Sequence, residues 1–338
     1  MTQRADPVGP PRPAGSVRTV PAAPALAGAT GAVGAMSAPT TRHDPHISLR
    51  QNLTGWAFAL PFVAIFLMFM AGPLLASLAL SFTDFGLRDL RNPLGTNFIG
   101  LQNYVELFRD KTFWTSLANT AYFVVIGVPL TLGLGLAIAL GLDRGIRRFR
   151  TIYRVGYYLP VVTSIVGIAV VWRFVLNPDY GLLNMAMGAV GIQGPDWLAD
   201  PVLAMPSLIA MAAWRNLGFA MVLFLAGLQT IPVQLYEAAS IDGAGRWAAF
   251  KSVTLPLLRP TLLFAVVITT IGYLQVFEEP FVMTDGGPLD RTLSISMFMY
   301  QEGFEFFHQG YAAAIAWVLF LLVALLAVVQ FRALRSQT

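Results

Sequence analysis

The hydrophobic residues of this chain gather into long, predominantly apolar stretches. A helix that crosses a membrane needs about 20 apolar residues, because each residue adds about 1.5 Å to its length. Six stretches reach that length, at residues 55–80, 116–141, 156–176, 205–229, 260–283 and 310–331. The pattern therefore predicts an all-α integral membrane protein with six transmembrane helices, and their even number places both termini on one side.

The composition agrees with this prediction. Of the 338 residues, 56% are hydrophobic and 12% are charged, which is too apolar for a soluble α/β or β domain. The chain has no cysteine, which excludes disulfides and thiol catalysis. His43, His46 and His308 lack the spacing of metal ligands. No basic patch interleaved with aromatic residues suggests nucleic acid as a partner.

The connections between the stretches alternate in charge, and short connections rich in Lys and Arg stay in the cytoplasm. The third and fifth connections are acidic, with Arg291 as their single basic residue. Basic residues instead lie before the first stretch, in the second and fourth connections and in the C-terminal tail: Arg42, Arg50, Arg144, Arg147, Arg148, Arg150, Arg246, Lys251, Arg259, Arg332 and Arg335. We therefore expect both termini in the cytoplasm.

The N-terminal segment differs from the rest of the chain. Residues 1–48 are rich in Pro, Ala, Gly, Ser and Thr and show no helical periodicity. Pro21 and Pro24 interrupt its one weakly apolar part, so it does not have the pattern of a secretory signal. We expect a disordered cytoplasmic tail at 1–48, followed by a six-helix transmembrane domain at 49–338. Within that domain, the spacing of apolar residues from Leu101 to Phe108 predicts a short amphipathic helix.

The fourth connection, residues 236–260, predicts two short helices at an angle. Pro232 can begin the first helix, Asp242 and Gly243 break it, and a second helix follows until Pro256. Trp247 and Phe250 would then form an apolar ridge in the cytosol, which is costly unless a partner groove covers it. From the pattern alone, an amphipathic loop lying on the bilayer explains the segment equally well.

This connection closely resembles the EAA loop of the permease subunits of ABC importers. The matching positions are Glu237, Ala238, Ala239, Asp242, Gly243, Ala244, Phe250, Leu255, Pro256 and Pro260. The resemblance implies a coupling helix that sits in a cleft of an ATPase subunit, with Trp247 as a further contact. It also implies that Glu237 pairs with a cation of the ATPase and that Gly243 occupies a sharp turn where a Cβ would clash.

The chain itself lacks the signature of an ATPase. A P-loop needs glycines that frame a lysine, so that backbone amides and the ammonium group cradle phosphate. Lys111 has no such frame, and Phe250 stands before Lys251 where the second glycine would be. We therefore expect no cofactor in this chain and expect ATP and Mg²⁺ to be bound by a partner ATPase.

A second resemblance narrows the family. FVMTDGGPLDRT with the last stretch, and YYLP with LNPDYGLLN, resemble the maltose-type carbohydrate permeases. This resemblance implies the type I ABC importer fold in a bacterial plasma (inner) membrane. It also implies a second homologous permease, two ATPase subunits and an extracytoplasmic solute-binding protein. The implied solute is a di- or oligosaccharide such as trehalose or maltose, a polyol or glycerol phosphate.

Polar residues within the stretches mark a candidate pathway, because a central arginine costs about 2.5–3.5 kcal/mol on insertion scales. Arg215 lies near the middle of its stretch beside Asn216, and Thr269 and Tyr273 share a helix face. The resemblance places Arg215, Asn216, Phe219, Thr269, Tyr273 and Val276 near the pocket of the family. Gln275, Glu278 and Glu279 lie close by, toward the outer mouth. A purely structural ion pair for Arg215 is the alternative.

Two other classes of membrane protein are alternatives. A six-span intramembrane enzyme, such as a lipid-linked sugar transferase, would use Glu278 and Glu279 as acids. Adjacent residues diverge by about 100° on a helix, so the two carboxylates do not face one another and we expect no enzyme. A secondary transporter would show an internal repeat or broken helices in matching halves, and neither is visible in the sequence.

Overall fold

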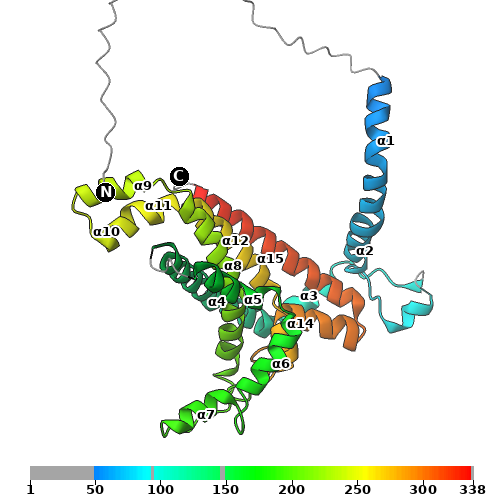
Figure 1. The fold of residues 1–338 in the computed structure, drawn as a ribbon. Coiled ribbons are helices and arrows are strands. Elements are labelled where there is room, and N and C mark those ends of the chain that lie inside the picture. Colours follow the sequence, from blue (N-terminus) through cyan, green and yellow to red (C-terminus); the bar gives the residue numbers. More distant parts are fainter. Residues whose placement is uncertain (1–48, 93–94, 145–148, 336–338) are drawn as a thin grey trace, which may run out of the picture. The chain divides into compact units, whose positions relative to one another are not determined.

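The computed structural model describes residues 49–92, 95–144 and 149–335, and their regular secondary structure is helical (Figure 1). One isolated antiparallel bridge joins Thr83 and Phe98. The predicted tail at 1–48 lies outside the described residues.

Four helical segments are long and apolar enough to cross a membrane: Trp56–Leu80, Lys111–Asp143, Ala204–Gln229 and Gln309–Arg332. Two bent helix pairs pass the same test when each pair is taken together, which raises the number to six. The first segment is built from α1 (Leu49–Phe66), the π-helical turn η1 (Leu67–Ala71) and α2 (Gly72–Leu80). All six predicted stretches therefore correspond to helical segments.

The first outer connection contains η2 (Leu87–Arg91) and α3 (Gln102–Arg109). The amphipathic helix predicted here is confirmed, because α3 buries Leu107 and Asn103 and packs against α15 (Gln309–Arg335). The Asn103 amide donates hydrogen bonds to the carbonyls of Ser81 (2.9 Å) and Thr83 (2.8 Å), which fastens α3 to the end of the first segment.

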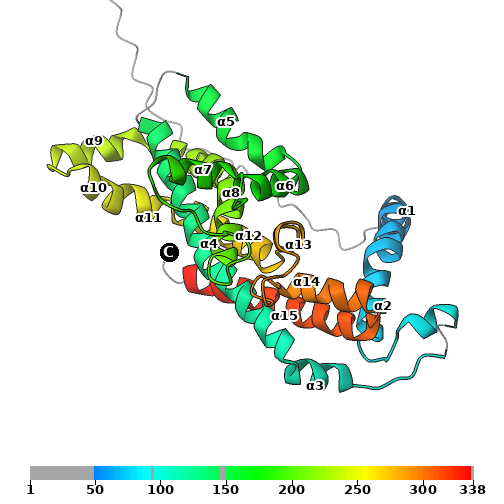
Figure 2. The same ribbon diagram turned by 90° about the horizontal axis from the view of Figure 1, so that it is seen from below.

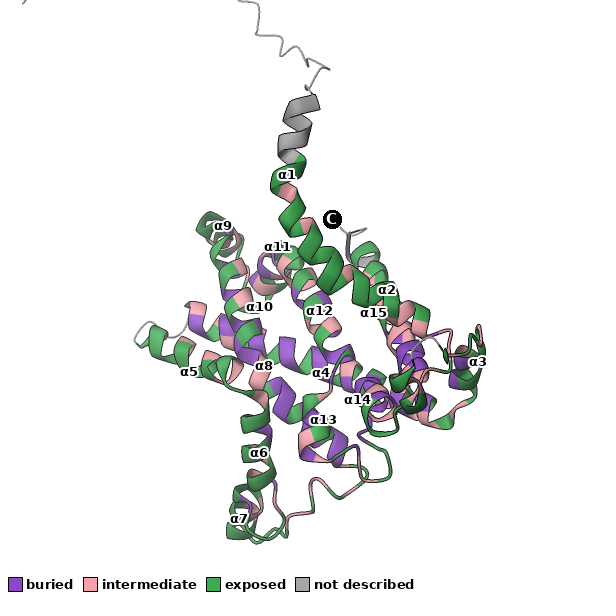
Figure 3. Cartoon of the chain, turned by 90° about the vertical axis from the view of Figure 1, so that its right-hand side faces the viewer, coloured by how far each residue is buried: buried purple, intermediate pink, exposed green. Residues whose placement is uncertain are grey.

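Helix α8 (Ala204–Gln229) is the centre of the packing and contacts α4 (Lys111–Arg144), α5 (Arg150–Val162) and α12 (Arg259–Leu274). Figure 3 shows buried residues gathered along α8 and α4. Small residues permit the close contacts: a Cβ on Gly135 would stand 2.6 Å from the Cβ of Ala220, and one on Gly218 would collide with the Tyr157 carbonyl. Between membrane helices, van der Waals contact at such residues replaces the hydrophobic effect as the stabilising force.

The third predicted stretch, 156–176, is not one straight helix. Helix α5 ends at Val162, α6 spans Ile165–Val175, and the two are bent by 100°. Pro160 removes a backbone donor from α5, and the Thr163 hydroxyl donates to the Leu159 carbonyl at 2.9 Å, a local bond that competes with the helix. The connection that follows contains α7 (Leu182–Ala189).

The fourth connection folds as α9 (Val233–Ile241), α10 (Arg246–Ala249), η4 (Phe250–Thr254) and α11 (Leu255–Leu257). The prediction of two helices at an angle is confirmed, with α9 as one arm and α10 to α11 as the other. The second arm continues past Pro256 to Leu257, and a 68° bend then leads into α12. Both arms extend from the end of α8, at the place where the chain enters α12 (Figures 1 and 2).

The predicted stretch 260–283 is also too long. Helix α12 ends at Leu274, and α13 begins separately at Glu278 and ends at Met283. Pro280 explains the break, because it lacks the N–H that a continuous helix would donate to the carbonyl of Val276. That carbonyl instead accepts a hydrogen bond from Ser294 at 2.6 Å. Helix α14 (Ile295–Tyr300) and the turn η5 (Gln301–Glu305) then pack against α15.

Candidate functional site

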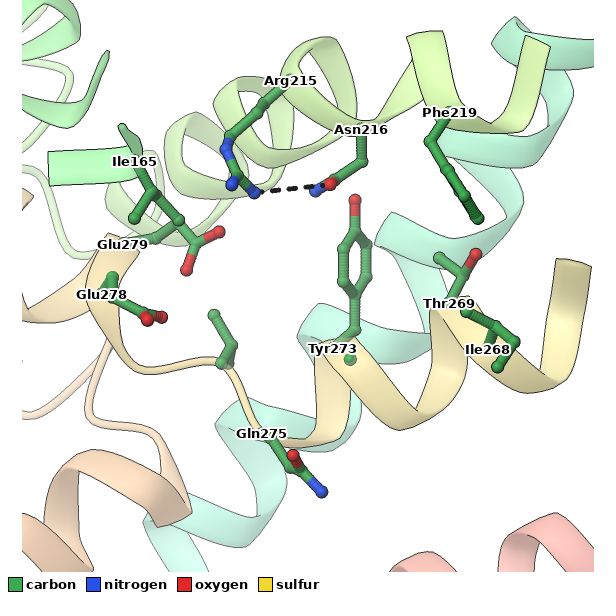
Figure 4. A pocket seen from close by; sticks show the side chains of 12 residues that line it. Ile165, Arg215, Asn216, Phe219, Ile268, Thr269, Tyr273, Gln275, Glu278 and Glu279 are labelled. Atoms are coloured by element: carbon green, nitrogen blue, oxygen red, sulfur yellow. Dashed lines mark hydrogen bonds between the residues drawn. The ribbon is translucent and has the colours of Figure 1, made fainter. Parts of the chain in front are cut away.

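A cavity of about 300 Å³ is lined by residues of α6, α8, α12 and α13 and of the break between α12 and α13 (Figure 4). The structure brings together here all eight candidate pathway residues: Arg215, Asn216, Phe219, Thr269, Tyr273, Gln275, Glu278 and Glu279. Ile165, Ile268, Gly272 and Val276 complete the lining. Residues from distant parts of the sequence therefore converge on one space.

Sequence reasoning did not single out Ile165, Ile268 or Gly272. The spacing of four residues between Ile268 and Gly272, and again between Gly272 and Val276, was a usable signal, since it places them on one helix face beside Thr269 and Tyr273. Ile165 had no such signal. It reaches the cavity only because the chain turns between α5 and α6, just before this residue.

On α8, a short hydrogen-bond chain orients Arg215. The Asn216 amide nitrogen donates to the Ala212 carbonyl at 2.9 Å, and its side-chain oxygen accepts from the Arg215 guanidinium at 3.4 Å. The Arg215 Nε atom is buried without a partner, and no ion pair joins this guanidinium to another described residue. The alternative of a structural ion pair thus finds no partner within the described part of the chain.

On α12, Tyr273 is fixed from two sides. Its hydroxyl is 2.7 Å from the Thr131 hydroxyl of α4, and its ring meets the Phe123 ring edge to face at 5.1 Å. Gly127 makes room for this ring, since a Cβ there would stand 2.8 Å from the Tyr273 Cε2 atom. The phenol is therefore held at the cavity wall by α4.

On α13, the two adjacent glutamates have different surroundings. Glu279 is 5% exposed, whereas Glu278 is exposed. The helix is held from α6, where the Arg173 guanidinium donates to the Val282 carbonyl at 3.2 Å. Among the described residues, no ion pair and no side-chain hydrogen bond from another residue reaches the Glu279 carboxylate, and no group of three His, Cys, Asp or Glu could hold a metal.

The lining combines two kinds of surface. Phe219, Ile165 and Ile268 offer apolar contacts, and Arg215 and the carboxylates offer hydrogen-bond donors and acceptors. Convergent polar groups beside apolar walls are typical of small-molecule sites, and polar side chains form the larger part of this lining. This arrangement can bind a polar solute.

The second candidate site is the pair of arms formed by α9 and by α10 to α11. Trp247 is 75% exposed and stacks on Phe250 with ring centroids 5.4 Å apart. Ile241 is 86% exposed at the end of α9 and extends this apolar surface, which sequence reasoning missed. The hydroxyls of Tyr236 and Thr254 lie 3.0 Å apart and tie the two arms together.

The turn between the arms corrects one expectation. Gly243 has φ +77°, and a Cβ there would meet no atom within 4 Å. The glycine is therefore required by its left-handed backbone and not by a steric clash. Of the other predicted coupling residues, Glu237, Ala238 and Asp242 are exposed, whereas Ala239, Ala244, Leu255 and Pro256 are partly buried.

Comparison with known proteins decides the family. The protein family described as "Binding-protein-dependent transport system inner membrane component" matches this chain over residues 127–336, a range that includes both candidate sites. The chain belongs to this family. It is a multi-pass membrane permease subunit of an ABC importer, a transport subunit and not an enzyme.

Similar permeases cover nearly the same length. The chain is 36% identical to the lactose transport system permease protein LacF of Rhizobium radiobacter, over 85% of this chain and 95% of LacF. It is 36% identical to the sulfoquinovosyl glycerol transport system permease protein SmoG of Agrobacterium fabrum, over 76% of this chain and 83% of SmoG. A chain of a bacterial alginate ABC transporter, solved with its alginate-bound periplasmic protein, matches with a TM-score of 0.73 and 24% identity. That match covers 86% of this permease and 96% of the solved chain and supports the type I fold.

Proposed function

We propose that this permease imports a di- or oligosaccharide such as trehalose or maltose, a polyol or glycerol phosphate, through the cavity between α8 and α12. The observation that carries the proposal is the convergence of Arg215, Tyr273 and Glu279 from three helices on one cavity. The lactose transport assignment of LacF supports a saccharide as cargo.

We further propose that residues 236–260 dock on a separate ATPase, which binds ATP and Mg²⁺. Ile241 and Trp247 are exposed, and Phe250 stacks on Trp247. This apolar surface supports the role, because it is costly in water unless a partner covers it. Glu237 is exposed on α9, the arm that also carries Ile241, and can pair with a cation of that partner.

The proposed assembly contains a second homologous permease, two ATPase subunits and an extracytoplasmic solute-binding protein. The periplasmic protein in the solved alginate transporter is a precedent for the last of these. Residues 49–338 would form the transmembrane domain, residues 1–48 a cytoplasmic tail, and both termini would lie in the cytoplasm, as the basic connections favour.

Purification through a tag on this chain tests the proposal. The complex should contain an ATPase and a second permease, and its ATP hydrolysis should rise several-fold when binding protein loaded with a saccharide or polyol is added. Hydrolysis that responds to no such solute would contradict the carbohydrate assignment. Absence of an ATPase from the complex would contradict the coupling assignment.

A further inference from the structure

The electric charge of the cargo is not set by family membership. LacF is named for lactose, which is neutral, whereas SmoG is named for sulfoquinovosyl glycerol, which carries a sulfonate. The charges in the cavity of this permease must therefore be considered on their own. That cavity holds one guanidinium, from Arg215, and two carboxylates, from Glu278 and Glu279.

Arg215 and Glu279 face the same space from different helices. Arg215 comes from the middle of α8 and Glu279 from the first turn of α13, and Figure 4 shows both side chains turned toward the cavity. They form no ion pair, so their nitrogen and oxygen atoms lie more than 4.0 Å apart. Both groups can therefore contact a ligand in the cavity without first breaking an ion pair with one another.

Both groups have unused hydrogen-bonding capacity. Glu279 is 5% exposed, and among the described residues no side chain of another residue bonds to its carboxylate. Arg215 is partly buried, and its guanidinium donates to Asn216 but forms no ion pair with a described residue. Unpaired buried charges are costly, so a ligand that bonds to both gains more than one that bonds to either alone. The ligand must present an acceptor to Arg215 and a donor to Glu279.

A hydroxyl group is both a donor and an acceptor. Two adjacent hydroxyls of a sugar can therefore accept from the guanidinium with one oxygen and donate to the carboxylate with the other. Phe219, which lines the cavity, can cover the apolar C–H face of the same sugar ring. Neighbouring Asn216 and Tyr273 hold the wall in place.

A charged ligand fits less well. An anion would satisfy Arg215 but would be repelled by two carboxylates, and a cation would satisfy Glu279 but would leave Arg215 unpaired in a buried site. We propose that Arg215 and Glu279 clamp adjacent hydroxyls of an uncharged sugar or polyol, and that Glu279 rejects anionic solutes. This inference rests on the proposed function, and it removes glycerol phosphate from the candidate cargoes.

Binding to the purified complex, without the binding protein, tests the inference. Trehalose, maltose and lactose would each be compared with a carboxylate analogue and an amino analogue on the same scaffold, by titration of the melting temperature. The wild-type complex should bind at least one neutral sugar with a Kd at least tenfold below those of its charged analogues. Tighter binding of an acid or amine form would overturn the inference and leave the carbohydrate function standing. Binding of no saccharide in any form would instead contradict the proposed function, and the inference with it.

The variant Glu279→Gln isolates the carboxylate. It should reduce the preference for the neutral sugar over the acid at least fivefold, because the amide no longer repels an anion. Glu305→Gln is the matched control: Glu305 is exposed on η5, outside the cavity lining, and its substitution should leave the preference unchanged. An unchanged preference in a Glu279→Gln complex with wild-type ligand-free melting would overturn the role of Glu279. If that variant fails to fold, the wild-type comparison alone decides.

Discussion

At the scale of single residues, Gly127 controls where the Tyr273 ring can lie. Any side chain at this position of α4 would enter the space of the ring, because a Cβ would stand 2.8 Å from Tyr273 Cε2. The ring in turn carries a hydroxyl that is bonded to Thr131 and that faces the cavity.

Gly127→Ala should therefore displace Tyr273 and weaken solute binding. Overpacking of this kind costs about 1–3 kcal/mol, so the melting temperature of the complex should fall and the Kd for the preferred sugar should rise. Gly133→Ala, on the same helix with no atom within 4 Å of its Cβ, is the control and should leave both values unchanged. Equal behaviour of the two variants would show that the ring is free to move.

Single residues also show how far sequence reasoning reaches. Arg215 could be singled out because a cation within an apolar stretch is expensive, and Thr269 with Tyr273 because their spacing is helical. The different burial of Glu278 and Glu279 agrees with their divergence on a helix. That Arg215 forms no ion pair with a described residue could not be predicted, because it depends on which neighbouring helices place a carboxylate within reach.

At the scale of elements, the turn between α9 and α10 lies in the proposed ATPase contact, residues 236–260, which we call the coupling loop. The backbone conformation of this turn should affect coupling to the ATPase. Gly243 adopts φ +77°, which costs a β-branched residue far more than glycine or asparagine. If α9 and α10 transmit movement as a unit, a change in this turn should alter coupling more than it alters membrane insertion.

Gly243→Val should thus lower solute-stimulated ATP hydrolysis at least fivefold in the assembled complex, while the amount of chain in the membrane stays the same. Gly243→Asn should retain most of the activity, because asparagine tolerates the left-handed region. Gly245→Ala is the control, since Gly245 has φ −68° and open space around its Cβ. Normal stimulation in the valine variant would remove the turn from the coupling mechanism.

The breaks within elements were harder to predict than the elements. Hydropathy shows that residues 156–176 are apolar. It does not distinguish one straight helix from two helices, α5 and α6, that are bent by 100° relative to each other. Pro160 and Pro280 were the available signals, yet proline is tolerated in many membrane helices, where neighbours satisfy the freed carbonyls. At Val276 that neighbour is Ser294, 18 residues further along the chain.

At the scale of the whole molecule, the positions of the six apolar segments followed from the sequence, because bilayer thickness fixes the length of an apolar helix. The breaks in two of them did not. The packing around α8 did not follow from it. It depends on close contacts at Gly135 and Gly218, which become visible only when the partner helices are known.

The proposed topology predicts opposite accessibility for two exposed positions. Because the chain has no cysteine, a single introduced cysteine is an unambiguous reporter. Ser240→Cys, on α9, should react with an impermeant maleimide only after the membrane is opened, whereas Gln193→Cys, in the third connection, should react in intact cells. The reverse pattern would place the coupling loop outside and contradict the proposed ATPase contact.

Uptake of a labelled sugar by proteoliposomes tests the central claim most directly. The account predicts uptake only when this permease is reconstituted with its partner permease and ATPase and is supplied with binding protein and ATP. It also predicts that Gly243→Val reduces this uptake. Uptake of the same sugar by this chain alone, without ATPase or ATP, would contradict the account.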